Sequence, residues 1–236
     1  MALQVVYVHL VAVHTIGTKC KKNAMNDLDL SEKIKSRLLD LWDKNKNHYD
    51  LNFFPLFPDK VKRNCLLFLS LNPSLSDKKN VSITYPMLNS SKSFENNDPK
   101  PHQHFKKFFE IQNEIKENWT FLDLLYIRNS SQPAIVQLYK EKPEFIISQV
   151  KVTIEIINEI KPKLVVVANR FVETILLQEY EQTKFKMENT IYCLEGIPFI
   201  MRESGFMGSW RHWKNNKELK EIMYTEIKRV LKIIDN

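Results

Sequence analysis

A buried strand that stops at Asn-Pro-Ser constrains the fold of this chain more than any other segment. The run from Leu66 to Leu71 is apolar apart from Ser70, which is typical of a strand buried on both faces of a sheet. Pro73 has no N–H and cannot continue a central strand, so Asn72 is predicted to lie at the carboxyl end of this strand. Ligands bind at that edge in open α/β sheets, which makes Asn72 a candidate site residue. Asn, Pro and Ser are also the commonest turn residues, so a plain turn is the alternative.

Helical and strand patterns alternate along the rest of the chain. Helices are predicted over residues 30–44, 102–117 and 146–160, after Asn169 and over 219–231, and strands over 65–71, 119–126, 164–168, 190–194 and 197–201. Strands that alternate with helices of this length imply right-handed crossovers and helices on both faces of a mostly parallel sheet. The expected fold is α/β, a three-layer α/β/α sandwich with a short, mainly parallel central sheet.

The length and composition suit one domain. A chain of 236 residues with 43% hydrophobic residues is sufficient for a single large core. Met25 stands just before a helix-capping run, so the folded domain is expected to span residues 25–236. Residues 1–24 begin with an apolar segment that lacks a basic flank and is too short to span a bilayer. We expect a dispensable extension there, with a secretory signal as the alternative, and no membrane partner.

Several ligand classes lose support from the composition. Only four glycines occur, and no GxGxxG, GxxxxGKS or GxxxxGKT string is present, which argues against NAD and ATP. Cys20, Cys65 and Cys193 are widely separated, so they cannot form a four-cysteine zinc or iron–sulfur site, and they fit a reducing compartment. We therefore expect no cofactor, no metal and a cytoplasmic location.

The net charge of +7 favours a polyanionic partner such as nucleic acid. Three of the basic residues, Lys19, Lys21 and Lys22, lie in the N-terminal segment 1–24, which contains no acidic residue. A solvated basic surface is therefore the alternative to a true binding patch.

Two polar segments carry further candidates for binding. The long stretch from Ser74 to Pro101 contains Tyr85 and Phe94, which can stack on a base or, alternatively, pack in a small satellite cluster. The segment from Gly205 to Trp213 combines small and aromatic residues with Arg211, and Phe206 is a candidate wedge for insertion into a duplex.

Taken in order, four segments resemble the motifs of the uracil-DNA glycosylase superfamily. They are Leu71-Asn72-Pro73-Ser74, the strand from Trp119 to Asp123 with Arg128, the Lys161-Pro162-preceded strand that ends at Asn169, and the segment from Ile200 to Gly205. The match spans about residues 62–213, and the order and spacing of the motifs carry it. The Asn-Pro form is most similar to the mismatch-specific and single-strand-selective branches, while the cysteine count excludes the iron–sulfur branches.

The resemblance implies a monomeric base-excision glycosylase that hydrolyses the N-glycosidic bond of a flipped uracil-like or other modified base in single- or double-stranded DNA. It implies catalytic roles for Asn72, which would orient the attacking water, and for Arg202. The candidate base-binding residues are Pro73, Ser74, Tyr85, Phe94, Asp123 and Asn169. The candidate DNA-binding residues are Arg128, Ser204, Gly205, Phe206 and Arg211.

The chain departs from the superfamily pattern at two of these positions. Arg202 stands where many members have His, and we expect it to stabilise the departing base anion electrostatically. Asp123 stands where the base-reading residue is commonly Asn, and an ionised carboxylate only accepts hydrogen bonds, so the substrate need not be uracil. A capping role or an ion pair with Arg128 is the alternative for Asp123.

Two other functions remain open at this point. One is a non-catalytic nucleic-acid-binding protein of the same fold, and the other is a hydrolase of a free nucleoside. They differ from a DNA glycosylase in whether Arg128, Arg202 and Arg211 converge on the edge that carries Asn72.

Overall fold

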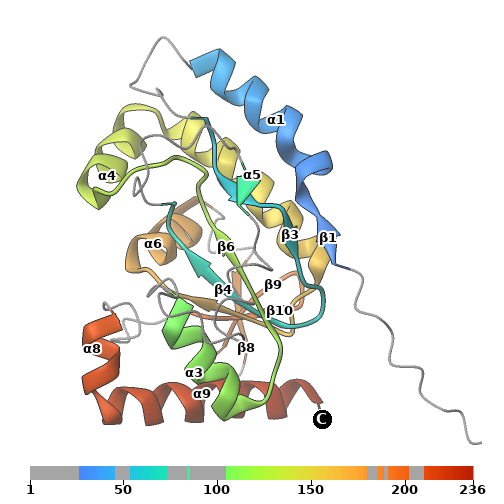
Figure 1. Cartoon of the computed structure of the whole chain (residues 1–236), viewed down its shortest axis with the longest axis vertical. Coiled ribbons are helices and arrows are strands. Elements are labelled where there is room, and N and C mark those ends of the chain that lie inside the picture. The colour runs from blue at the N-terminus through green and yellow to red at the C-terminus, as the bar shows by residue number, and fades with distance from the viewer. Residues whose placement is uncertain are drawn as a thin grey trace, which may run out of the picture.

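Six strands of the described part form one central sheet in the computed structural model (Figure 1). The structure describes residues 27–45, 54–73, 84–85, 105–179, 185–188, 191–201 and 210–235. In spatial order the strands are β6 (Trp119–Asp123), β4 (Leu66–Ser70), β7 (Leu164–Val167), β10 (Ile197–Ile200), β9 (Ile191–Leu194) and β8 (Phe185–Glu188). The first four are parallel to one another, whereas β9 and β8 are antiparallel to their neighbours. The sheet is therefore mixed, and the expected parallel arrangement holds for its first four strands.

Helices cover both faces of this sheet (Figure 1). One face carries α1 (Leu30–Asn45), α4 (Gln132–Glu141), α5 (Pro143–Ile160) and α6 (Arg170–Glu179), and the other carries α3 (Lys106–Ile115), α8 (Trp210–Asn215) and α9 (Lys217–Asp235). Successive strand residues point to opposite faces, so Leu67 and Leu69 join the core under α5 while Leu66 and Phe68 join the core under α3 and α9. The α/β class expected from the sequence is confirmed.

The strand order places a topological switch point between β4 and β7. From β4 the chain passes through α3 to β6, and it then returns through α4 and α5 to β7 on the other side of β4. The two connections lie on opposite faces of the sheet, which leaves a crevice at the carboxyl ends of the strands on either side of the switch point.

Local sequence explains several element boundaries. Helix α5 begins at Pro143, where a missing N–H costs nothing, and it ends where Lys161 adopts φ 45° before Pro162. Between β9 and β10, Glu195 and Gly196 have φ values of 50° and 81°, which is the geometry of a tight two-residue hairpin turn.

Short accessory strands flank the sheet. β1 (Leu28–Asp29) pairs with β3 (Lys60–Val61) in antiparallel orientation, and β2 (Phe57–Pro58) pairs with β5 (Thr84–Tyr85) in parallel orientation. Leu30 N donates to Asp59 O at 2.8 Å and thereby joins the start of α1 to the β2–β3 segment.

The sequence patterns missed some elements. Helices α4 and α8 and strand β8 were not expected, and β6 ends at Asp123 rather than at 126. Beyond Asp123 the chain bends across the end of β4, because Leu124 N and Leu125 N donate to Ser70 O and Leu71 O. Tyr126 N instead donates to a side chain of α5.

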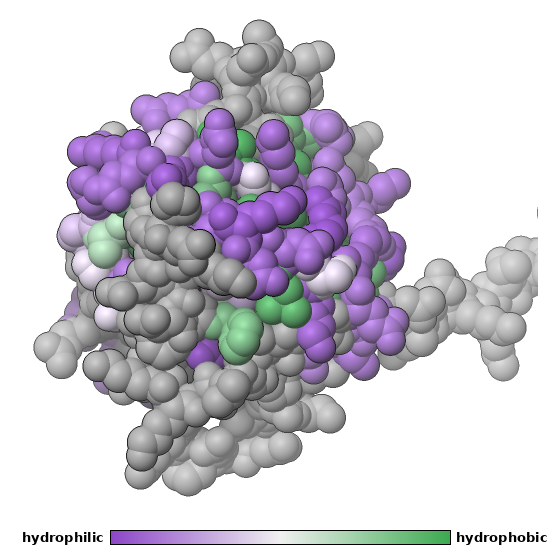
Figure 2. All heavy atoms as spheres, turned by 90° about the horizontal axis from the view of Figure 1, so that it is seen from above, coloured by the Kyte–Doolittle hydropathy of each residue, from purple (hydrophilic) through white to green (hydrophobic). Residues whose placement is uncertain are grey.

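The outer surface over α1 and α5 is mainly hydrophilic (Figure 2). Ion pairs join the two helices, among them Lys33 with Glu159 and Arg37 with Glu155. No helix in the described ranges is both long and apolar enough to span a membrane.

Candidate functional site

Three polar side chains follow neighbouring strands at the carboxyl edge of the sheet. Asn72 lies two residues beyond β4, Asp123 is the last residue of β6, and Asn169 lies two residues beyond β7. The register places Ser70 opposite Asp123, and Ala168 N donates to Leu69 O at 2.8 Å. Asn72 and Asn169 therefore flank the switch point, which is where ligands bind in sheets of this kind. These positions agree with the sequence prediction, while the roles assigned to the residues remain predictions.

The amide group of Asn72 joins the segments that follow β4 and β6. Its Nδ2 donates to Pro73 O at 3.0 Å, to Ile127 O at 3.1 Å and to Asn129 O at 2.7 Å. Asn129 N also donates to Pro73 O at 3.0 Å. An oxygen in the place of Nδ2 would face three carbonyl oxygens, so these contacts determine the orientation of the amide. Nδ2 is committed to the protein, and Oδ1 is the atom that can accept a hydrogen bond from a ligand or water.

Asp123 is a carboxyl group buried at the same edge. It is 5% exposed, and by strand alternation it lies on the face of the sheet that also carries Trp119 and Phe121. Burial raises the pKa of Asp123 to about 8, so at neutral pH the group is mostly protonated. The premise that Asp123 is an ionised residue that only accepts hydrogen bonds is therefore wrong. A neutral carboxyl has one O–H donor in addition to its acceptor oxygen.

The alternative explanations for Asp123 do not match its surroundings. The structure gives no ion pair between Asp123 and Arg128, both of which are described, and no side-chain hydrogen bond to Asp123 from the described residues. Arg128 is half-buried on the segment that follows β6, with a buried Nε that forms no hydrogen bond.

Two buried polar residues of α5 hold the segment that follows β6. Gln149 Oε1 accepts from Tyr126 N at 2.9 Å, and Thr153 Oγ1 donates to Leu124 O at 3.0 Å. The hydroxyl groups of Thr153 and Tyr126 are 2.8 Å apart, and burial raises the pKa of Tyr126, so its phenol stays neutral. These contacts support the backbone between Asp123 and the carbonyl groups that accept from Asn72.

Sequence reasoning missed Gln149 and Thr153, although a signal was present. They lie four residues apart on the face of α5 that is otherwise lined by apolar side chains, and both are 0% exposed. Polar groups at buried positions of one helix stripe require hydrogen-bond partners inside the protein. That requirement identifies them as candidates for holding a neighbouring loop.

Asn169 caps the start of α6. Its Oδ1 accepts from Phe171 N at 2.8 Å, and its Nδ2 donates to Gln132 Oε1 at 3.2 Å, which connects the first residues of α6 and α4. Tyr139 and Phe171 also contact each other edge to face between these helices, with ring centroids 5.8 Å apart. Both polar atoms of the Asn169 amide have protein partners, and its base-binding role stays a prediction.

A buried lysine in the first turn of α3 was not predicted as a site residue. Lys107 is 6% exposed, and its Nζ lies 5.4 Å from the centroid of the Phe108 ring. Burial lowers the pKa of Lys107 to about 8. Because α3 precedes β6 and packs against the sheet face that carries Phe121, its first turn lies toward the carboxyl edge (Figure 1).

The remaining predicted residues are only partly accessible to this description. Pro73 is buried next to Asn72, and the backbones of Tyr85 and Arg211 lie in β5 and α8. Ser74, Phe94, Arg202, Ser204, Gly205 and Phe206 lie outside the described residues, as do the side chains of Tyr85 and Arg211. The convergence of the three arginines on the Asn72 edge is therefore untested.

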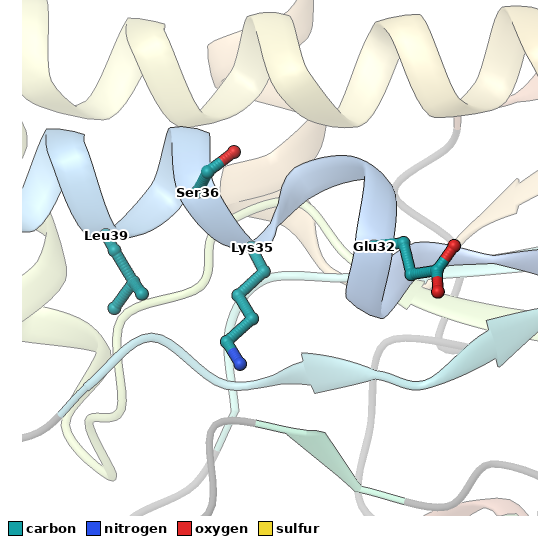
Figure 3. A pocket seen from close by; sticks show the side chains of 4 residues that line it. All are labelled: Glu32, Lys35, Ser36 and Leu39. Carbon is teal, nitrogen blue, oxygen red and sulfur yellow. The ribbon is translucent and has the colours of Figure 1, made fainter.

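An open cavity of about 520 Å³ lies elsewhere, along α1 (Figure 3). It is lined by Glu32, Lys35, Ser36 and Leu39, and Lys35 points toward the strands β2 and β3 in the close-up view. One acid, one base, one hydroxyl and one apolar side chain from a single helix do not form a set of convergent groups for chemistry. The described residues contain no group of three or more His, Cys, Asp or Glu residues that could hold a metal ion.

Comparison with known proteins adds no name to this site. No known family model matches the chain, and no curated protein sequence matches it.

Proposed function

We propose that this protein is a DNA glycosylase with a uracil-DNA glycosylase-like fold that hydrolyses the N-glycosidic bond of a flipped base. One observation carries the proposal: Asn72 and Asp123 end adjacent parallel strands beside the topological switch point, with a water-orienting amide next to a hydrogen-bonding carboxyl. The strand order β6-β4-β7-β10 and the motif resemblance support the same reading. The net charge of +7 is compatible with a DNA substrate.

Asn72 has the geometry to orient a nucleophilic water. Three backbone carbonyls hold its Nδ2, so Oδ1 accepts a hydrogen bond from the water and directs a lone pair of the water oxygen toward C1′ of the sugar. The C1′–N bond breaks, its electron pair leaves with the base, and the water oxygen bonds to C1′. The water loses a proton to solvent and the base gains one. An amide is a poor proton acceptor, so the contribution of Asn72 is positional.

Asp123 is placed to contact the extruded base. Extrusion costs a few kcal/mol, which contacts with the base and the DNA backbone must offset. Arg202 keeps its proposed role of stabilising negative charge on the departing base, and Arg128, Ser204, Gly205, Phe206 and Arg211 keep their proposed contacts with DNA.

An excision assay on oligonucleotides that carry uracil, hypoxanthine and other modified bases tests the proposal. The wild type is expected to generate abasic sites from at least one substrate, and Asn72→Ala is expected to lose most of that activity at a temperature where it remains folded. Asn113→Ala, on the exposed face of α3, is the matched control and should retain activity. Failure of the wild type on every base, or full activity of Asn72→Ala, would contradict the assignment.

A second candidate is a protein of the same fold that binds nucleic acid without excision. The observation that favours it is the structural use of the Asn72 amide, whose nitrogen stabilises two loops whether or not chemistry follows. Oligonucleotide binding by a wild type that excises no base would select this candidate.

A further inference from the structure

We propose that Asp123 acts as a neutral carboxylic acid that selects a base edge with one N–H donor directly beside one carbonyl acceptor. This inference rests on the proposed function and specifies the substrate class of that site. Uracil and hypoxanthine carry such an edge. An ionised carboxylate would instead favour an edge with two adjacent N–H donors.

The surroundings of Asp123 favour the neutral form. The residue is 5% exposed at the end of a strand whose same-face side chains, Trp119 and Phe121, are aromatic and buried. No cation or hydrogen-bond donor of the described residues pairs with its side chain. A carboxylate buried without such partners is strongly destabilised, so the proton is retained.

The ionisable groups of the neighbouring elements do not reverse this conclusion. Tyr126 is neutral and hydrogen-bonded to Thr153 on the α5 side. Lys107 in the first turn of α3 is itself buried, and the pKa of Asp123 is raised by desolvation with no contribution from a cation. Ser70, opposite Asp123 on β4, carries no charge. Arg128, on the segment after β6, forms no ion pair with Asp123.

A neutral carboxyl has the hydrogen-bonding pattern of a carboxamide. Its carbonyl oxygen accepts from the ring N–H of the base, and its O–H donates to the adjacent exocyclic oxygen. The two hydrogen bonds are lost together when the acid ionises, because the donor disappears and the negative charge faces the exocyclic oxygen. The burial that keeps the acid neutral therefore determines which base edge it recognises.

The pH profile of excision tests this inference with uracil and hypoxanthine oligonucleotides as probes. The wild-type rate is expected to fall about tenfold per pH unit above pH 8, where Asp123 ionises. Asp123→Asn is expected to lack this alkaline limb, whatever its rate at pH 7, because an amide does not ionise. Asp40→Asn, an exposed substitution on α1, should keep the wild-type profile. A wild-type rate that stays flat above pH 8, or an Asp123→Asn profile with the same fall, would overturn the proposal.

A stability measurement separates this inference from the proposed function. The acid binds a proton more tightly in the folded than in the unfolded state, so its contribution to the free energy of unfolding is present below pH 4 and is lost as pH rises to about 8. The difference in unfolding free energy between wild type and Asp123→Asn should therefore change over this range. If it does so while no base is excised, Asp123 is neutral and the glycosylase proposal fails. If it does not, the neutral acid itself is refuted, whatever the activity.

Discussion

Replacing Asn72 by Asp tests the orientation of the amide directly. In many sites this change would supply a stronger base to activate water. Here Nδ2 lies within 3.1 Å of three backbone carbonyl oxygens, so either oxygen of a carboxylate would face those carbonyls without a proton to share. The substitution removes two N–H donors and places a negative charge against three partial negative charges.

The expected loss of stability follows from this geometry. Each hydrogen bond contributes roughly 0.5–1.5 kcal/mol net, and a buried acceptor left without a donor costs about 1–3 kcal/mol. Asn72→Asp should therefore lower the free energy of unfolding by about 2–4 kcal/mol at pH 8. Asn72→Ala should cost less, because it removes the donors without adding a charge and because Pro73 O retains its bond from Asn129 N.

The deficit of Asn72→Asp should also depend on pH. The surrounding carbonyls favour the protonated acid, so the pKa of the introduced carboxyl is raised in the folded state, and the deficit should grow as pH rises from 4 to 8. Urea unfolding of wild type, Asn72→Asp and Asn72→Ala at pH 5 and pH 8 measures this, with each variant compared with wild type at the same pH. An Asn72→Asp protein as stable as wild type at pH 8, or a deficit equal at both pH values, would refute the reasoning.

Other changes test the supports of the site. Thr153→Val should cost about 1–3 kcal/mol in urea unfolding because Leu124 O and the Tyr126 hydroxyl lose a buried partner, and a cost below about 0.5 kcal/mol would contradict this. Asn169→Ala should cost about 0.5–2 kcal/mol through loss of the α6 cap, and equal stability would argue against the cap. Lys107→Met should raise stability at pH 7 by up to about 3 kcal/mol, because a lysine with a lowered pKa destabilises the fold below pH 8, and the gain should vanish near pH 10.5. Removal of residues 1–24 should leave the thermal midpoint almost unchanged, and a loss above about 2 kcal/mol would show that the segment packs on the domain.

Local sequence determined the strand ends that carry the candidate site. The run from Leu66 reaches 0% exposure over four residues in β4, and Pro73 prevents the strand from continuing, so the position of Asn72 follows from neighbouring residues alone. Lys161 and Pro162 likewise separate α5 from β7. Helix α4 also has a local signal, a Ser131 cap, but its short apolar stripe was too weak to predict it.

Only the tertiary structure decided the chemical state of those residues. The orientation of the Asn72 amide depends on carbonyl groups 55 and 57 residues away along the chain, which α5 holds in place through Gln149 and Thr153. The sequence identifies Asp123 as an acid, but its protonation follows from the packing that excludes water from the end of β6. Side-chain type is local, whereas hydrogen-bond partners and desolvation arise from segments that meet only after folding, so the sequence could locate these residues but not predict what they can donate or accept.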